Sequence, residues 1–141
     1  MFNLPFEKRM QFWHDFRAGL ESSEDPIQDT IDFWNTVPIT NIAADPYDRE
    51  NWPDPWEMIF ENSYCSFVKI LAILYTLQLT DRFSQSRFEI HITQDKEKSE
   101  TKYLLFLDGL CIGYDIGQAI PISKLSNKLT FEISYSMNNL L

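Results

Sequence analysis

The sequence predicts one α+β domain over residues 1–141, with three helices packed on a mainly antiparallel sheet of about four strands. Two observations predict this class. Apolar residues recur at the helical period as far as Leu79, whereas after Asp81 they alternate with polar residues, as in half-buried strands. Hydrophobic residues make up 44% of the chain and aromatic residues 15%, which is enough for one packed core at this length.

Two amphipathic helices are expected first. Apolar residues recur at every third or fourth position from Pro5 to Leu20, which predicts a helix over this range. A second helix should follow Asp25, a favourable N-cap residue, with Pro26 in its first position. Pro38 should end this helix, because the residue before a proline is disfavoured in the helical conformation.

The stretch from Ile39 to Pro55 is expected to be irregular but ordered. Its prolines exclude regular structure, while its aromatic residues Tyr47 and Trp52 argue against a floppy linker. We expect Trp52 to pack on the body of the domain. We also expect Tyr47 or Trp52 to border a surface that binds a protein partner, because both residue types are enriched at interface hot spots.

The clearest local signal is the run from Asp54 to Glu57. It places an acid at the N-cap, a proline in the first helical position and a glutamate in the third, which together form a capping box. A third helix, mostly apolar and therefore buried, is expected from Pro55 to about Leu79. It either continues throughout or restarts near Asn62, which favours a helix start.

Four strands are expected in the second half, each with apolar and polar residues in alternation. Their ranges are Phe88–Thr93, Tyr103–Leu107, Leu110–Tyr114 and Leu129–Tyr135. The dipeptide Asp108-Gly109 favours a tight hairpin turn between the second and third strands. Residues 94–102 should form a charged loop and residues 115–128 an irregular stretch. We expect six apolar side chains of the first and fourth strands to point into one core. These are Phe88, Ile90, Ile92, Leu129, Phe131 and Ile133.

The chain is acidic, with a net charge of −9 from 21 acidic and 12 basic residues. This charge argues against nucleic-acid binding, whose affinity comes from Lys and Arg displacing counterions from phosphates. An acidic surface can instead mimic nucleic acid, so a decoy for a nucleic-acid-binding protein is one alternative. No signal sequence or membrane-spanning segment is expected, which favours a cytoplasmic protein or a component of a virion assembled in a cytosol.

No cofactor or metal is expected. The chain has four glycines and no glycine-rich phosphate loop. The acids of the Ile39–Pro55 stretch lack the alternating ligands and the central glycine of a calcium loop, and turns and caps explain them better. These acids are Asp45, Asp48, Glu50 and Asp54. The two cysteines, Cys65 and Cys111, are too few for a disulfide framework and are expected to be reduced.

Three residues form a candidate catalytic set. Cys65 lies near a possible helix start, where the helix dipole favours a thiolate. His91 lies on the more polar face of the first strand and could act as a general base. Asp108 closes the second strand and could orient the imidazole, as in a nucleophile–base–orienter triad.

The order and spacing of these residues resemble the transglutaminase-like branch of the papain-like cysteine enzymes. The matching segments are Tyr64-Cys65, His91 in FEIHI and Asp108 in YLLFLDG, within about Pro55–Tyr114. The resemblance implies a helix that begins with the catalytic cysteine, followed by a strand with histidine and a strand ending in aspartate. It implies acyl-transfer or hydrolytic activity with Cys65 as nucleophile, His91 as base and Asp108 as orienter.

Each member of the set also has a simpler interpretation. Cys65 could be an inert residue inside a continuous buried helix, His91 a solvent-facing strand residue and Asp108 a turn residue. The leading hypothesis is therefore a small acidic interaction or assembly protein that acts through protein–protein contacts, and the cysteine enzyme is the alternative. The small size, acidity and aromatic content also resemble accessory or virion proteins of tailed bacteriophages.

Overall fold

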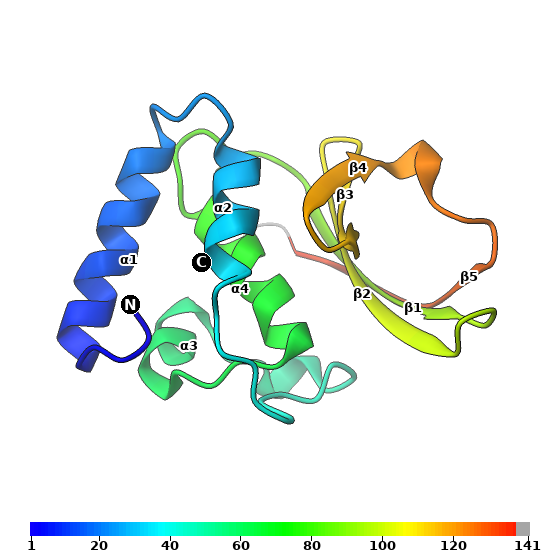
Figure 1. Ribbon diagram of the computed structural model, residues 1–141, viewed down its shortest axis with the longest axis horizontal. Coiled ribbons are helices and arrows are strands. Elements are labelled where there is room, and N and C mark those ends of the chain that lie inside the picture. Colours follow the sequence, from blue (N-terminus) through cyan, green and yellow to red (C-terminus); the bar gives the residue numbers. More distant parts are fainter. Residues whose placement is uncertain (138–141) are drawn as a thin grey trace. The chain divides into compact units, whose positions relative to one another are not determined.

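The computed structural model describes residues 1–137 (Figure 1). Contacts within the chain group it into two compact units, Met1–Ser84 and Gln85–Leu141. The first unit contains the helices and the second contains an antiparallel sheet, which confirms the predicted α+β class. The sequence showed no boundary near Ser84, and the expectation of one domain over residues 1–141 stays a prediction.

The first unit follows the predicted order of helices, with one difference. Its elements are α1 (Phe6–Leu20), α2 (Pro26–Trp34), the 3-10 turn η1 (Arg49–Asn51), α3 (Pro55–Glu61) and α4 (Ser66–Gln78). Asp25 caps α2 through a hydrogen bond from the Gln28 amide, and Pro26 is the first helical residue, as predicted. No helix within residues 1–137 is long and apolar enough to cross a membrane.

The predicted third helix is two helices in the structure. Asp54 forms the expected capping box at the start of α3, with its carboxylate accepting from the Trp56 and Glu57 amides. The helix then ends at Asn62, whose φ of 53° is in the left-handed region that Asn tolerates better than most residues. The Asn62 side-chain amide donates to the Phe2 carbonyl at 2.8 Å. The single long helix was therefore wrong, and the restart that the sequence also allowed is the observed arrangement.

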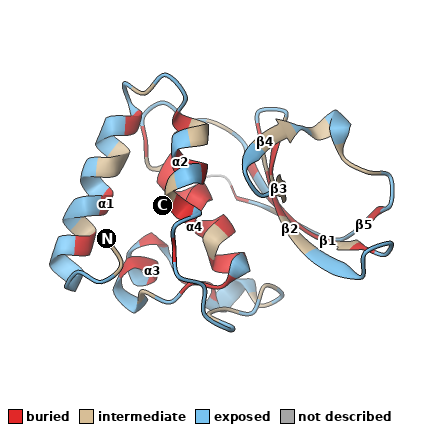
Figure 2. Ribbon diagram, viewed as in Figure 1, coloured by how far each residue is buried: buried red, intermediate tan, exposed pale blue. Residues whose placement is uncertain are grey.

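Helix α4 is the centre of the first unit. Ten of its 13 residues are buried, so it has almost no solvent-facing side (Figure 2). The buried hydroxyl of Thr76 accepts hydrogen bonds from the indole N–H of Trp13 at 3.0 Å and of Trp34 at 2.9 Å. It also donates to the Ala72 carbonyl. One side chain thus links α1, α2 and α4, because each indole N–H must find a partner when it is buried.

A buried arginine joins α1 to α3. The Arg9 guanidinium donates twice to the Ile59 carbonyl, at 3.2 and 3.1 Å, and once to the Phe60 carbonyl at 3.1 Å. It also donates to the Leu4 carbonyl at 2.7 Å. The last carbonyls of a helix have no partner within that helix, and Arg9 supplies one together with a positive charge at the negative end of α3.

The stretch between α2 and α3 is ordered by Trp52, as predicted. The Trp52 ring is 9% exposed, lies 4.9 Å from the ring of Phe67 and donates its N–H to the Asp45 carbonyl at 2.9 Å. Tyr75 of α4 donates its hydroxyl to the Pro53 carbonyl at 2.8 Å. These contacts give Trp52 an anchoring position, whereas Tyr47 is 51% exposed.

The second unit is a five-stranded antiparallel sheet in the order β4-β3-β2-β1-β5. The strands are β1 (Phe88–Asp95), β2 (Glu100–Leu107), β3 (Leu110–Asp115), β4 (Gln118–Pro121) and β5 (Leu129–Ser136). The additional strand, β4, lies within residues 115–128, which were expected to be irregular. A second 3-10 turn, η2 (Ile122–Lys124), follows it.

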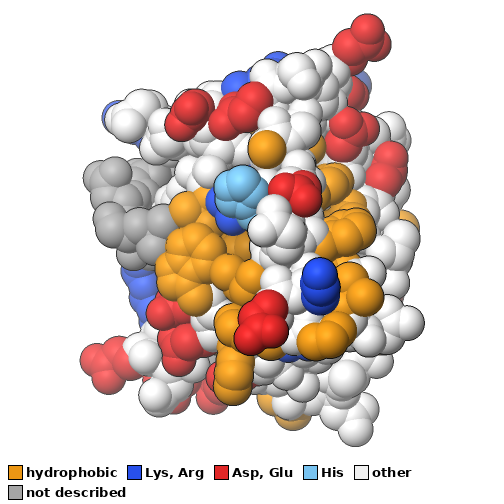
Figure 3. Space-filling model, turned by 90° about the vertical axis from the view of Figure 1, so that its left-hand side faces the viewer, with side chains coloured by type: hydrophobic (Ala, Val, Ile, Leu, Met, Phe, Trp, Pro, Cys, Tyr) orange, Lys and Arg blue, Asp and Glu red, His pale blue; other side chains and the backbone are white. Residues whose placement is uncertain are grey.

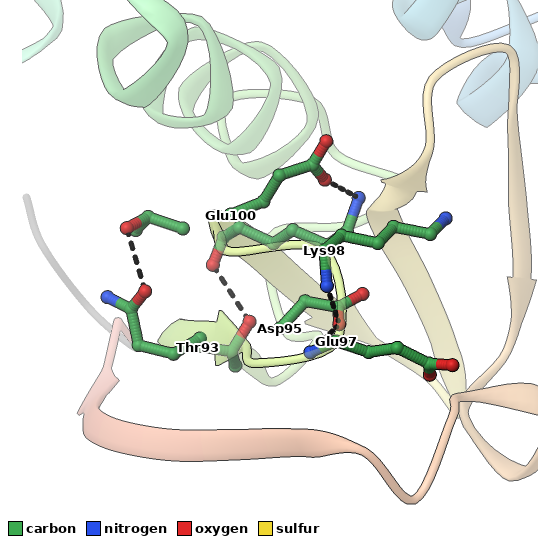
Figure 4. A network of polar contacts seen from close by, with 8 residues as sticks. Thr93, Asp95, Glu97, Lys98 and Glu100 are labelled. Atoms are coloured by element: carbon green, nitrogen blue, oxygen red, sulfur yellow. Dashed lines mark hydrogen bonds and ion pairs between the residues drawn. The ribbon is translucent and has the colours of Figure 1, made fainter.

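The hairpin between β1 and β2 extends further than the apolar pattern suggested. Asp95 is buried at the end of β1, and its carboxylate accepts hydrogen bonds from the Glu97 and Lys98 amides, both at 3.2 Å (Figure 4). The Thr93 hydroxyl donates to the Lys102 carbonyl at 3.0 Å, across the same hairpin. The carboxylate closes the turn in the way that Asx turns do, which lets both strands pair up to Glu100.

The expectation that six side chains share one core was correct for β1 and wrong for β5. Phe88, Ile90 and Ile92 are fully buried on one face of the sheet. Leu129 is also buried, but it pairs with Asp95 and packs with Leu104 and Cys111, on the other face of the sheet. Phe131 and Ile133, however, are 45% and 36% exposed. The reason is that β5 is an edge strand, and that its register with β1 shifts between Ile92 and Thr93. The shift places Phe131 opposite Thr93, on the opposite face from Ile92.

Candidate functional site

Cys65 occupies the N-cap position of α4. Its φ and ψ of −108° and 178° are extended, and its carbonyl accepts from the Lys69 amide at 2.9 Å to form the first helical bond. Cys65 therefore lies at the start of a helix and not within one, which is the placement that the nucleophile hypothesis requires. The side chain is 8% exposed and caps no helix amide.

His91 lies in the middle of β1 and is buried, so the interpretation as a solvent-facing residue was wrong. Its Nδ1 lies 2.6 Å from the Ser134 hydroxyl on β5, and its Nε2 lies 3.6 Å from the Glu89 carboxylate. The second distance is too long for a hydrogen bond, and it would suit an ion pair only with a protonated imidazole. Phe106 and Phe131 flank the imidazole, with centroid distances of 4.1 and 5.3 Å. Burial lowers the pKa of His91, and the nearby Glu89 carboxylate opposes this shift.

Asp108 lies in the turn between β2 and β3. Its φ is 50° and that of Gly109 is 82°, as the predicted tight hairpin turn requires. Its carboxylate accepts from the Ser86 hydroxyl at 3.3 Å. The turn thus accounts for this aspartate without any contact to an imidazole.

The strand register separates Asp108 from His91. His91 pairs with Leu104 on β2. Leu107, the residue before Asp108, pairs with Phe88, which lies three residues from His91 along β1. Asp108 is therefore more than three residues from His91 along the strand direction. At roughly 3.3 Å per residue, the two side chains start about 10 Å or more apart along the sheet. The structure therefore brings His91 to Ser134 and not to Asp108. Cys65 belongs to the first unit, whereas His91 and Asp108 belong to the second.

Sequence reasoning missed Ser134 and Glu89 as neighbours of His91. Glu89 lies two positions from His91 on the same strand, so the alternation of side chains could have identified it. Ser134 could not be identified in this way, because its position opposite His91 depends on the pairing of β1 with β5 and on the register shift.

A modest fall in pH is expected to weaken the fold through His91. Because burial lowers its pKa in the folded state, His91 stays neutral there while an unfolded histidine takes up a proton below a pH of about 6.5. The stability from neutral His91 is therefore complete above that pH and is lost as the pH falls toward the lowered pKa. Urea unfolding at about pH 7.5 and about pH 5.5 should show a smaller loss for His91→Gln than for the wild type.

The control for this experiment is His14→Gln, which changes an exposed histidine of α1 and should leave the pH dependence as in the wild type. An equal loss of stability in the wild type and in His91→Gln would contradict the role of His91.

The acids of the loop act as turns and caps. The Asp45 carboxylate accepts from the Tyr47 amide at 2.9 Å, the Asp48 carboxylate accepts from the Asn51 side chain at 2.7 Å, and Asp54 forms the capping box. Across residues 1–137, no three His, Cys, Asp or Glu side chains lie close enough together to hold a metal ion.

The chain was compared with known proteins in sequence and in structure. No protein-family model matches it, and no curated protein matches it in sequence. Among solved structures, it is similar to calcium-bound LapG of Legionella pneumophila, with a TM-score of 0.58 and 14% sequence identity. The similarity covers 91% of this chain and 74% of LapG. At this identity the comparison concerns the fold alone, and it supports the resemblance to the transglutaminase-like fold that the order of Cys65, His91 and Asp108 suggested.

Proposed function

We propose that the chain is a binding domain with a transglutaminase-like fold that acts through contact with a protein partner. The observation that carries this proposal is the register of β1 and β2, which leaves Asp108 in a turn and away from His91. A catalytic histidine needs one ring nitrogen directed at the nucleophile and the other held by an orienting group. In this sheet, Nδ1 of His91 faces Ser134 and Nε2 faces Glu89.

Exposed aromatic side chains supply the contact surface in this proposal. Phe6, Trp56 and Phe60, here called the aromatic surface, are 37%, 41% and 65% exposed. The rings of Phe6 and Phe60 meet edge to face at 5.2 Å, so they form one patch and are not scattered. Figure 3 shows apolar side chains gathered across the face of the molecule that includes α1. Contiguous apolar patches of this kind mark binding sites.

Tyr47 is the second element of the proposed contact. It is 51% exposed on the ordered loop, whereas Trp52 is held against Phe67. We expect Tyr47→Ser and Phe60→Ser to lose partner binding with little change in melting temperature, since more than half of each side chain is exposed. Truncation of an interface hot spot typically costs about 2 kcal/mol or more of binding free energy. Trp52→Ala is the control and should lose stability instead. Cross-linking and affinity capture with the folded protein would measure binding, and unchanged capture in both serine variants would contradict the proposed contact.

Cysteine reactivity tests whether Cys65 belongs to a catalytic triad. In a Cys111→Ser background, Cys65 is the sole thiol, and alkylation of the folded protein near neutral pH is expected to be at least about tenfold slower than that of the urea-unfolded chain. The physical reason is that the Cys65 side chain is buried. His91→Gln should leave this rate unchanged. Rapid stoichiometric labelling of Cys65 that disappears in His91→Gln would overturn the proposal, because a thiolate made by an adjacent base behaves in this way.

The second candidate is a cysteine-dependent acyl-transfer or hydrolytic enzyme. The specific observation in its favour is that Cys65 directly precedes α4, a helix of 13 residues. In this candidate His91 is the base and Asp108 the orienting group, as the resemblance implies. The labelling experiment above decides between the two candidates. A phage or virion role, a cytoplasmic location and a nucleic-acid-mimicking decoy stay predictions from the sequence.

A further inference from the structure

The first unit contains a pocket of about 240 Å³ that the proposed function does not use. His14, Arg17 and Ala18 of α1 line it, together with Glu21 and Leu79, the C-cap residues of α1 and α4. The spacings 14 to 17, 14 to 18, 17 to 21 and 18 to 21 are three or four residues, so these side chains share one face of the helix end. The pocket therefore combines a cation, a histidine and an apolar wall.

Arg17 is the unusual member of this pocket. Its guanidinium lies 4.3 Å from the ring centroid of Trp13 and 5.9 Å from that of Trp56. Its Nε is buried without a hydrogen-bond partner, and within residues 1–137 the side chain forms no hydrogen bond or ion pair. Arg9, two turns earlier on the same helix, makes four hydrogen bonds. Arg17 is only half-buried, and the buried Nε is out of reach of a ligand. A ligand in the pocket would therefore be bound by the terminal Nη groups, which form no hydrogen bond within residues 1–137.

Glu21, the acid in the pocket, is hydrogen-bonded to backbone amides. The Glu21 carboxylate accepts from the Asp81 amide at 2.7 Å and from the Arg82 amide at 3.2 Å, so both of its oxygens are engaged by the turn that follows α4. Burial lowers the pKa of Arg17, but a guanidinium remains protonated in proteins. The pocket thus holds a cation with unused donors beside a carboxylate whose oxygens are already bound.

We propose that this pocket binds a monocarboxylate that carries a short hydrocarbon group, with Arg17 as the donor. A guanidinium presents a planar fork that matches the two oxygens of a carboxylate. Ala18 and Leu79 offer an apolar wall for the hydrocarbon part. The negative charge of Glu21 in the same pocket repels any anion, and it repels a dianion such as phosphate more strongly than a monocarboxylate.

Two-dimensional NMR titration of the folded chain tests this proposal. Isovalerate represents a free carboxylic acid, and N-acetyl-leucine represents the terminal carboxylate of a polypeptide. For either or both, we expect saturable shifts at Ala18 and Leu79 with a dissociation constant of about 1–10 mM, which suits ligands of this size. Tighter binding of N-acetyl-leucine would assign the site to a polypeptide carboxylate, and tighter binding of isovalerate would assign it to a free acid. N-acetyl-leucinamide, which lacks the carboxylate, should produce no saturable shifts.

Two variants connect the binding to Arg17. Arg17→Met should weaken it at least about tenfold, because the charge and both donors are lost. Lys8→Met removes an exposed cation from the same helix and should leave the dissociation constant unchanged. Melting temperatures of both variants would show that the fold is retained. Absence of saturable shifts with both carboxylates, equal binding by Arg17→Met, or tighter binding of inorganic phosphate than of either carboxylate would overturn the proposal. None of these outcomes depends on whether Cys65 is reactive or a protein partner binds at Tyr47.

Discussion

Thr76→Val is expected to lower the free energy of unfolding by about 2–5 kcal/mol, although valine has nearly the same shape as threonine. The loss comes from Trp13 and Trp34, whose indole N–H groups both donate to the Thr76 hydroxyl in a fully buried site. A buried donor left without a partner costs about 1–3 kcal/mol, and this substitution leaves two. Urea unfolding followed by circular dichroism would measure the change.

Thr30→Val is the matched control. Thr30 is also fully buried, but its hydroxyl only donates to the Pro26 carbonyl one turn earlier in α2. No buried donor loses its partner in this variant, so we expect a loss of less than about 1 kcal/mol. Similar losses in the two variants would show that burial of a hydroxyl, and not the shared bond to two indoles, determines the effect.

Arg9→Met is expected to be equally severe, with a loss of about 3–5 kcal/mol. The methionine keeps much of the apolar stem, but it leaves the carbonyls of Ile59, Phe60 and Leu4 without the donors that Arg9 supplies. Arg9→Lys should recover only part of the loss, because an ammonium group cannot reproduce the planar fork of a guanidinium. Chemical unfolding of both variants would measure these changes.

Arg17→Met is the control for Arg9→Met, since it removes an arginine of the same helix that makes no hydrogen bond with the described residues. Its expected loss is about 0.5–1 kcal/mol, from the contact with the Trp13 ring. A loss for Arg17→Met as large as that for Arg9→Met would contradict the assignment of Arg9 as the link between α1 and α3.

The parts of the fold that could be predicted are those determined by neighbouring residues. The capping box at Asp54 involves side chains and amides within four positions, and the turn at Asp108-Gly109 needs only the local tolerance of positive φ. The alternation around Ile90 likewise predicted a strand and the burial of Ile90 and Ile92, although His91 on the other face is buried as well. Each of these patterns is visible in the sequence because its cause lies within a few residues.

The parts that could not be predicted depend on distant pairing. The end of α3 at Asn62 involves a hydrogen bond to Phe2, which lies 60 positions away. The contact between His91 and Ser134 requires the pairing of β1 with β5 and a register shift. The candidate site shows the same division: the start of the helix at Cys65 was one of two predicted arrangements, whereas the separation of Asp108 from His91 emerged only from the strand register.

The distribution of tryptophan provides the molecule with a built-in optical probe. All four tryptophans lie in the helical unit, and two of them share the hydroxyl of Thr76. Indole emission therefore reports on the helices alone, whereas tyrosines are present in the sheet as well. Unfolding curves recorded by indole emission and by the amide signal of the strands would coincide if the two units melt together. They would separate if the helices and the sheet lose their structure in different steps.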